Sequence, residues 1–205
     1  MAAPVETDEA RAKIAEVEAE LRAGRVDVDG VLADPRYLPL HGYTSFRAVI
    51  RGYAATGRVT MVTADEPGPR CVAHGRVVDA KGRPLAGAEL YVYQTDARGW
   101  YAAEAPHISA NSGDQRHARL FGYLRLGADG RYELRTIRPG GYPRTDLPAH
   151  IHFEVKGLVT EILFEDDPRL TPEGRVRGEQ SGFVVAKPVA GADGVTRYEA
   201  NFVIR

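Results

Sequence analysis

The spacing of apolar residues divides this chain into a helical first part and a longer part made of strands. Apolar residues recur at helical spacing over residues 8–23, at Ile14, Val17 and Leu21, on an otherwise charged surface. A second short helix is predicted over Ser45–Ala54, where apolar residues again share one face. A narrow apolar stripe like the first docks either on a domain face or on a second subunit, and on this basis we expect a homodimer.

From residue 58 onward the pattern predicts short β-strands separated by turn signals rich in Gly, Asp and Pro. The predicted strands are Val59–Thr63, Val72–Val78, Ala88–Thr95, Leu120–Leu126, Tyr132–Thr136, His150–Lys156, Glu161–Phe164, Phe183–Ala186 and Arg197–Ile204. Strands of this length and spacing are typical of an antiparallel β-sandwich. We therefore expect an all-β domain over residues 58–205, preceded by a helical extension over residues 1–57 that includes a connector at Asp34–Tyr43.

Composition narrows the class of protein without identifying it. The chain has 205 residues and a net charge of −1, which favours neither nucleic acid nor an acidic membrane surface as a partner. No run approaches the ~20 apolar residues of a membrane-spanning helix. Cys71, as a single cysteine, forms no internal disulfide, and the acidic start at Glu6, Asp8 and Glu9 does not resemble a signal peptide. We expect a cytoplasmic protein.

The first candidate chemistry lies in the segment PAHIHF at residues 148–153. In a strand, alternate side chains share a face, so His150 and His152 project to the same side about 7 Å apart along the strand. Two imidazoles in this arrangement can bind one metal ion. An isolated pair can also be two partly exposed histidines without a ligand, so the rest of the site has to decide between these interpretations.

Four segments of the chain, taken together, match the pattern of a known enzyme group. The segments are HGRVVDAKGRPLAGAELYVYQTDARGWY (74–101), GYLRLGADGRYELRTIRPGGYP (122–143), PAHIHFEV (148–155) and TEILFEDDP (160–168). In this order they resemble the intradiol ring-cleavage dioxygenases, the group of catechol, hydroxyquinol and protocatechuate dioxygenases. The first segment is also typical of many β-sandwich modules without an active site, whereas TIRPGGYP followed by PAHIHF is more specific.

The resemblance implies a mononuclear non-haem Fe(III) site with two tyrosine and two histidine ligands. The matching positions are Tyr101, Tyr142, His150 and His152. Phenolate oxygen is a hard anionic donor and suits a hard ferric ion. The implied reaction uses O2 to cleave a catecholic diol between its two hydroxylated carbons, giving a muconate-type diacid, with Tyr142 as the ligand that leaves and accepts a proton. Taken singly, Tyr101 is more typical of a packing residue, and Tyr142, between Gly141 and Pro143, is typical of a turn aromatic.

The chain departs from the family pattern just before PAHIHF. Most members have an arginine there that stabilises negative charge on the substrate, and this chain has Leu147. The nearest replacement cation is Arg144, and Arg116 and Arg119 near the end of the long loop at residues 102–119 are other candidates. We expect one of these arginines to compensate, which favours a narrower or unusual catecholic substrate.

A second departure is Glu161, where protocatechuate-type relatives carry glutamine. A glutamate beside a bound catecholate would either repel it or act as a base, and it can equally be a solvent-facing strand residue paired with an arginine. The predicted catalytic residues are Tyr142, Arg144 and Glu161, and the predicted substrate contacts are Trp100, Arg144 and Leu147. Of the other histidines, His74 is predicted to be structural, His107 and His117 are candidates for lining the pocket, and His41 is uninformative.

Two rival functions stay open at this stage. The first is a transthyretin-like or carboxypeptidase-regulatory-like β-sandwich that binds a partner or a sugar without metal chemistry. The second keeps the metal but uses Glu161 as the base of a lyase or hydrolase reaction. Convergence of the four predicted ligands separates the first rival from the dioxygenase, and oxygen consumption separates the second.

Overall fold

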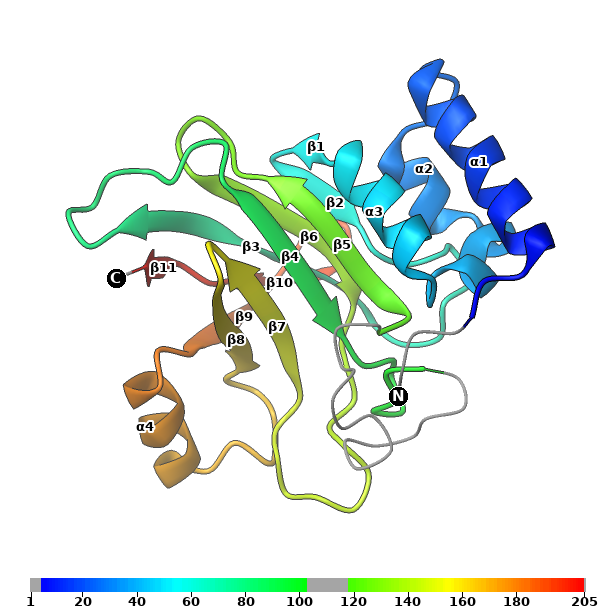
Figure 1. The fold of residues 1–205 in the computed structure, drawn as a ribbon. Coiled ribbons are helices and arrows are strands. Elements are labelled where there is room, and N and C mark those ends of the chain that lie inside the picture. Colours follow the sequence, from blue (N-terminus) through cyan, green and yellow to red (C-terminus); the bar gives the residue numbers. More distant parts are fainter. Residues whose placement is uncertain (1–4, 103–117, 205) are drawn as a thin grey trace.

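The computed structural model describes residues 5–102 and 118–204 (Figure 1). The first part contains α1 (Asp8–Arg22), α2 (Val28–Ala33), the 3₁₀ helix η1 (Pro35–Leu40) and α3 (Thr44–Gly52). The strands are β1 (Ala55–Thr56), β2 (Arg58–Thr60), β3 (Arg70–Asp79), β4 (Glu89–Gln94), β5 (Leu120–Arg125), β6 (Arg131–Ile137), β7 (His150–Val155), β8 (Leu158–Phe164), β9 (Val184–Ala190), β10 (Thr196–Glu199) and β11 (Phe202–Ile204). The helix α4 (Pro172–Gln180) lies between β8 and β9.

The strands form one mixed sheet, so the prediction of an antiparallel β-sandwich is wrong, although the fold is mainly β. The strand order is β1-β5-β4-β7-β8-β9-β10-β3-β6-β2, with β11 paired to β3. Of the ten strand pairs in the described part of the chain, five are parallel. An antiparallel sandwich has two separate sheets, whereas here all the described strands belong to one sheet, with β11 alone off its main path.

The two ends of that path meet on one short segment, which nearly closes the sheet into a barrel. Consecutive strands β1 and β2 pair with β5 and β6, respectively. Between them, the Gly57 N–H donates to the carbonyl of Arg125 and its carbonyl accepts from the N–H of Glu133, both at 2.8 Å. Gly57 has φ +85°, a conformation that L side chains rarely adopt, and it lets the chain pass from one end strand to the other.

The helix α4 explains one of the parallel pairs. Parallel neighbours such as β8 and β9 need a crossover connection, and α4 provides it. The apolar pattern did not predict α4, because this helix has no apolar stripe and buries only Gly178. Its start signals are present, since Pro172 occupies the first turn and the Thr171 hydroxyl accepts from the Gly174 N–H at 3.0 Å.

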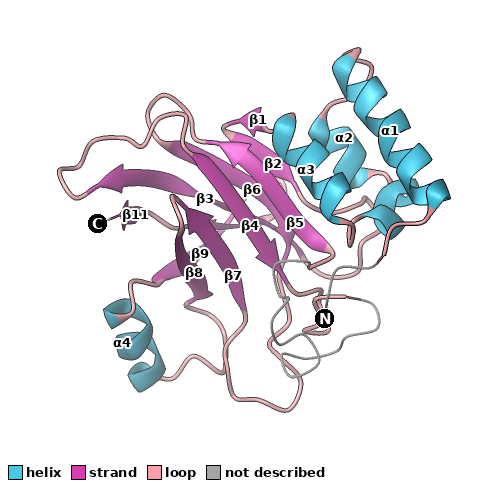
Figure 2. Cartoon of the chain, in the orientation of Figure 1, coloured by secondary structure: helices cyan, strands magenta, loops and turns pink. Residues whose placement is uncertain are grey.

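The N-terminal helices pack against the barrel on the side away from α4 (Figure 2). The predicted stripe of Ile14, Val17 and Leu21 is buried within this same chain, in a core that continues into the barrel. The buried Arg47 of α3 also ties this part to the barrel, with its guanidinium 3.8 Å from the Phe121 ring centroid. The homodimer and the division at residue 57 stay predictions.

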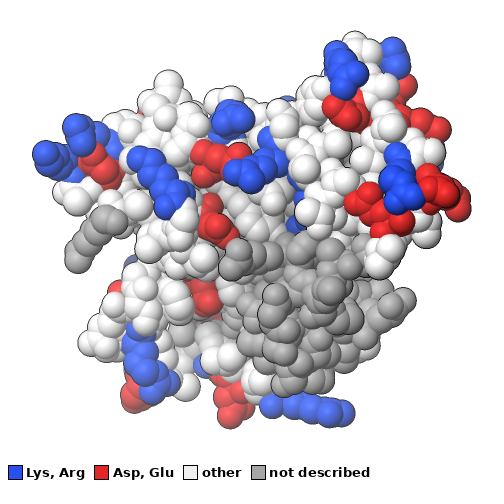
Figure 3. All heavy atoms as spheres, viewed as in Figure 1, with Lys and Arg blue, Asp and Glu red and all other residues white. Residues whose placement is uncertain are grey.

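The structure can be compared directly with the helices predicted for residues 1–57 and with the expected absence of a membrane-spanning helix. Both predicted helices are confirmed, as α1 and α3, but the expected connector contains η1 and follows an unpredicted helix, α2. Within the described ranges, no helix combines the length and the apolar character that crossing a membrane requires. Basic and acidic side chains are mixed over the face seen in Figure 3, in keeping with the small net charge.

Candidate active site

The centre of the site is β7, which lies between β4 and β8 in the sheet. His150 and His152 are 8% and 6% exposed, and their ring centroids are 4.8 Å apart. His152 is paired across the sheet with Tyr93 on one side and Glu161 on the other. Its ring stacks on Tyr93 at 4.4 Å, which fixes the plane of the imidazole.

The structure brings both predicted tyrosines to these histidines. The Tyr142 hydroxyl lies 2.9 Å from His150 Nε2, and the Tyr101 hydroxyl lies 2.8 Å from His152 Nε2. The two hydroxyls are also hydrogen-bonded to each other. Four potential donor atoms of four buried side chains therefore converge. We call Tyr101, Tyr142, His150 and His152 the tyrosine–histidine cluster.

A close approach of two glycine-containing segments places the two tyrosines together. A Cβ on Gly99 would lie only 2.3 Å from the carbonyl oxygen of Gly141, and Gly99 also has φ +87°. A Cβ on Gly140 would lie 2.5 Å from the carbonyl oxygen of Ala97. The Thr95 hydroxyl donates to the Gly140 carbonyl at 2.8 Å and closes this contact. Only glycine fits such positions, which gives the ARGWY and PGGYP motifs a structural reason.

Burial sets the protonation of the cluster. It raises the pKa of the Tyr101 and Tyr142 phenols well above their usual range. Burial, followed by the neighbouring His150, lowers the pKa of His152 to about 3. Neutral imidazole is the form that binds metals, and a buried phenol ionises only when a nearby cation compensates its charge.

The donor set suits a hard trivalent ion. His150 Nδ1 is 2.8 Å from the Pro148 carbonyl, and this contact requires the proton on Nδ1 and leaves Nε2 free to bind a metal. The donor separations of 2.8 and 2.9 Å are also those of neighbouring ligands around one ion with bonds of about 2.0–2.1 Å. Two phenol oxygens and two imidazole nitrogens thus fit the implied ferric ion.

A second set of donors shares the same histidines. Ligand atoms of His150, His152 and Glu161 all lie within 4.8 Å of one another. Within this group, His152 Nδ1 lies 3.6 Å from a Glu161 carboxylate oxygen. Glu161 is largely buried, with 20% of its side chain exposed, and burial raises its pKa above the usual range.

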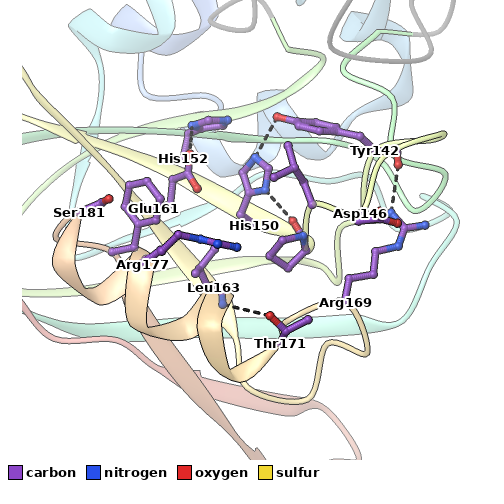
Figure 4. A pocket seen from close by; sticks show the side chains of 15 residues that line it. Tyr142, Asp146, His150, His152, Glu161, Leu163, Arg169, Thr171, Arg177 and Ser181 are labelled. Atoms are coloured by element: carbon purple, nitrogen blue, oxygen red, sulfur yellow. Dashed lines mark hydrogen bonds and ion pairs between the residues drawn. The ribbon is translucent and has the colours of Figure 1, made fainter.

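A cavity of about 450 Å³ opens beside the cluster (Figure 4). Tyr142, His150 and His152 line it, whereas Tyr101 is not among the described residues that line it. Leu147 and Glu161, two of the predicted residues, also line it. The opposite wall comes from α4 and the segment before it, including residues that the sequence reading missed: Arg169, Thr171, Arg177 and Ser181.

Other predicted residues lie elsewhere. In the described part of the chain, Arg144 and Trp100 do not line this cavity. The Arg119 guanidinium is paired with the Glu66 carboxylate at 2.5 and 2.6 Å. His107, Arg116 and His117 fall outside the described residues. His74 lies in β3, consistent with a structural role.

Comparisons with known proteins fit this geometry. A family described as Dioxygenase matches residues 45–205. This chain belongs to the intradiol ring-cleavage dioxygenase family. Among relatives, a 6-chlorohydroxyquinol 1,2-dioxygenase of Cupriavidus pinatubonensis is 30% identical over 158 residues, covering 67% of this chain and 54% of the relative. A protocatechuate 3,4-dioxygenase beta chain of Burkholderia cepacia is 35% identical over 120 residues, covering 50% and 48%.

A solved structure supports the same intradiol dioxygenase relationship. The structure of hydroxyquinol 1,2-dioxygenase from Pseudomonas putida aligns with a TM-score of 0.51 and 26% identity, covering 73% of this chain and 60% of that one. The chain spans about half the length of the curated relatives that it matches. Membership of the intradiol family is therefore shown for most of this chain, while its own substrate is a separate question.

Proposed function

We propose that this chain binds mononuclear non-haem Fe(III) and uses O2 to cleave a catechol-type diol between its two hydroxylated carbons, giving a muconate-type diacid. The observation that carries the proposal is the convergence of four donor atoms in the tyrosine–histidine cluster. Membership of the intradiol family supports it, because relatives are named as catechol and hydroxyquinol 1,2-dioxygenases. The same membership disfavours a binding module without metal chemistry.

Each residue of the site has a task in this proposal. When bound, Fe(III) supplies the Lewis acidity that ionises phenols and a chelating diol. Tyr142 faces the cavity, and we assign its phenol oxygen to accept a proton from the substrate. Tyr101 does not line the cavity, and we assign it, together with the two histidines, to hold the ion. Arg144 and Glu161 stay predicted contributors to charge balance on the substrate, and Trp100 and Leu147 stay predicted substrate contacts.

We also propose a domain organisation, an oligomeric state and a location for this protein. Residues 58–205 form the catalytic domain, residues 1–57 its helical extension, and the protein acts as a cytoplasmic homodimer on a small catecholic substrate and O2. Sedimentation or light scattering tests the dimer independently of any activity.

The grouping of His150, His152 and Glu161 favours one alternative, the metal-dependent lyase or hydrolase, with Glu161 as a metal ligand in place of the predicted base. The two functions differ in what binds the metal. Tyrosinate bound to Fe(III) gives a broad visible charge-transfer band, whereas imidazole and carboxylate ligands do not. The lyase or hydrolase would also consume no oxygen.

The first experiment is the visible spectrum of the purified protein with its iron quantified. Colour, about one iron per chain, a shift to longer wavelength with anaerobic catechol and oxygen uptake in air are the expected results. Tyr142→Phe should change the band, whereas Tyr123→Phe, which alters a half-buried tyrosine outside the cluster, should not. A protein that stays colourless after ferric reconstitution overturns the proposal. A coloured protein that takes up no oxygen with any catecholic diol would contradict the proposed reaction, whereas the proposed metal site would stand.

A further inference from the structure

The wall formed by α4 has an unusual composition on its cavity side. Gly174, Arg177, Gly178 and Ser181 line the cavity, and their spacing places them on one face of the helix. A Cβ on Gly178 would lie 2.8 Å from Leu163 Cδ1, so glycine lets α4 approach β8 closely. Arg177 is therefore the one long side chain that this face of α4 directs at the cavity.

Arg177 lines the cavity, and in Figure 4 its side chain runs from α4 toward the side where Glu161 and His150 lie. Among the described residues, no carboxylate forms an ion pair with its guanidinium. Arg175, two residues earlier on the same helix, behaves differently: it pairs with Glu165 at 2.9 Å and Glu179 at 3.1 Å. One arginine of α4 is thus bound to surface carboxylates, while the other faces the space where a substrate would lie.

The other charged groups of the cavity leave this role to Arg177. Arg169 Nη1 already donates to the Tyr142 carbonyl at 3.0 Å, so it supports the backbone at the cluster. Asp146 and Glu161 enter from other walls, and no ion pair joins either one to Arg177 in the described ranges. Among the described residues, Arg169 and Arg177 are the two cations that line the cavity, and of these Arg177 is the one on α4.

The size of the cavity allows a substituted ring. Small-molecule sites span roughly 300–1,000 Å³, and about 450 Å³ gives room beyond a single unsubstituted ring. A guanidinium binds a carboxylate through two parallel hydrogen bonds, which fixes orientation as well as charge.

We propose that Arg177 binds an anionic ring substituent, so that the preferred substrates are catechols bearing a carboxylate. This inference rests on the proposed function, because it assumes that the diol oxygens face the tyrosine–histidine cluster. The carboxylate then points away from the cluster toward α4, and the pair of contacts fixes which ring edge meets the reacting oxygen. Arg177 is a specificity-determining residue in this arrangement.

The test compares 3,4-dihydroxybenzoate, 3,4-dihydroxybenzamide and unsubstituted catechol as substrates. The wild-type kcat/KM should favour the acid over the amide by about tenfold or more, since hydrogen bonds to charged groups contribute about 1.5–3 kcal/mol. Arg177→Ala should lower kcat/KM for the acid about 10–100-fold, mainly through KM, and by at least ten times more than for catechol. Arg177→Lys should restore part of the loss, and Arg175→Ala should leave the acid-to-amide ratio at the wild-type value.

Three outcomes overturn the inference: no wild-type preference for the acid, an equal loss on all three substrates in Arg177→Ala, or an equal effect of Arg175→Ala. Anaerobic calorimetry with 3,4-dihydroxybenzoate measures binding without turnover. It therefore tests Arg177 even in a protein that lacks the visible band or oxygen uptake. Absence of colour and turnover contradicts the proposed function, whereas acid binding that is indifferent to Arg177→Ala contradicts this inference.

Discussion

Two buried histidine environments in this molecule look alike by burial and differ in what they can bind. His41 is 1% exposed, its Nδ1 lies 2.8 Å from the Arg119 carbonyl, and its ring stacks on Phe46 at 5.4 Å. The Arg47 guanidinium donates to the His41 carbonyl at 2.9 Å. In the tyrosine–histidine cluster, by contrast, imidazole nitrogens meet phenol oxygens beside a cavity.

The difference shows which features indicate a site. Burial lowers the pKa of His41 to about 4 and that of His152 to about 3, so a depressed histidine pKa occurs in both places. At His41 the nearby Arg47 guanidinium already supplies positive charge, which disfavours a metal ion. Of the two environments, only the second has phenol donors, convergence of donor atoms and access from a cavity. Four substitutions test this contrast.

The largest effect is expected from His150→Ala. Loss of one ligand should remove most of the bound iron and the visible band, and should lower turnover by more than the ~10–100-fold that is typical of residues outside the ligand set. His74→Ala, on β3 and outside the cluster, is the control and should retain iron and colour. Iron content per chain and oxygen uptake are the measurements. Full retention of iron by His150→Ala contradicts the ligand assignment.

Next in size is Gly99→Ala, which tests the contact that places the tyrosines together. A Cβ here meets the Gly141 carbonyl at 2.3 Å and also forces a side chain into φ +87°. Gly82→Ala isolates the backbone cost, since Gly82 has φ +76° and nothing within 4 Å. We expect about 1–2 kcal/mol of destabilisation for Gly82→Ala, and a larger loss together with a weakened band for Gly99→Ala.

Denaturant unfolding and the visible spectrum separate the two glycine variants. If the close approach is what holds Tyr101 against Tyr142, only Gly99→Ala should alter the spectrum. Equal stability losses with unchanged spectra in both variants would show that the contact with Gly141 relaxes easily.

A smaller effect is expected from Glu161→Gln. The Glu161 carboxylate lies 3.6 Å from His152 Nδ1, where its negative charge favours a cation bound on the far side of the ring. Removing this charge should weaken iron binding about tenfold, which is the lower limit of the ~10–100-fold loss typical of residues that contact metal ligands. Competition with a chelator measures the change. Glu165→Gln, which breaks a surface pair with Arg175, should leave the affinity as it is. Unaltered iron affinity in Glu161→Gln would show that the charge of Glu161 does not stabilise the bound ion.

The sequence predicted that four tyrosine and histidine donors converge, but it did not predict the barrel, and the reason is physical. The spacing of His150 and His152 and the glycine motifs before each tyrosine are local requirements, so they are visible in the sequence. Strand direction is not local: β8 and β9 run parallel because of α4, whose polar surface gave no apolar period. Barrel closure likewise depends on one short segment around Gly57 meeting two distant strands.

The cavity wall formed by α4 was not predicted for the same reason, because it depends on contacts between residues far apart in the sequence. Arg177 is far from PAHIHF in the sequence and reaches the cavity only because α4 crosses beside β8. Arg144 is close in the sequence and was therefore predicted, yet among the described residues the cations at the cavity come from Arg169 and Arg177. Proximity along the chain is a poor guide to which side chain faces a substrate.

The smallest effect is expected at His41, and it concerns stability and not iron. Its folded pKa of about 4 lies below the usual 6.5, so on acidification the unfolded chain takes up a proton first. Stability is fully present above pH 6.5 and is lost as pH falls toward 4. Between pH 7 and 5 this residue should account for about 2 kcal/mol of lost stability.

His41→Gln removes that titration and keeps an N–H donor for the Arg119 carbonyl. Urea unfolding of both proteins at pH 7 and pH 5, at equal iron loading, should show a smaller acid loss in the variant. His152 is present in both proteins, so its own titration cancels from the difference. The visible band at pH 7 should match that of the wild type, because His41 contributes no donor to the cluster. Equal acid losses in the two proteins would mean that His41 is protonated in the folded state as easily as in the unfolded chain. Of the two environments, only the tyrosine–histidine cluster would then contain a histidine whose pKa burial lowers.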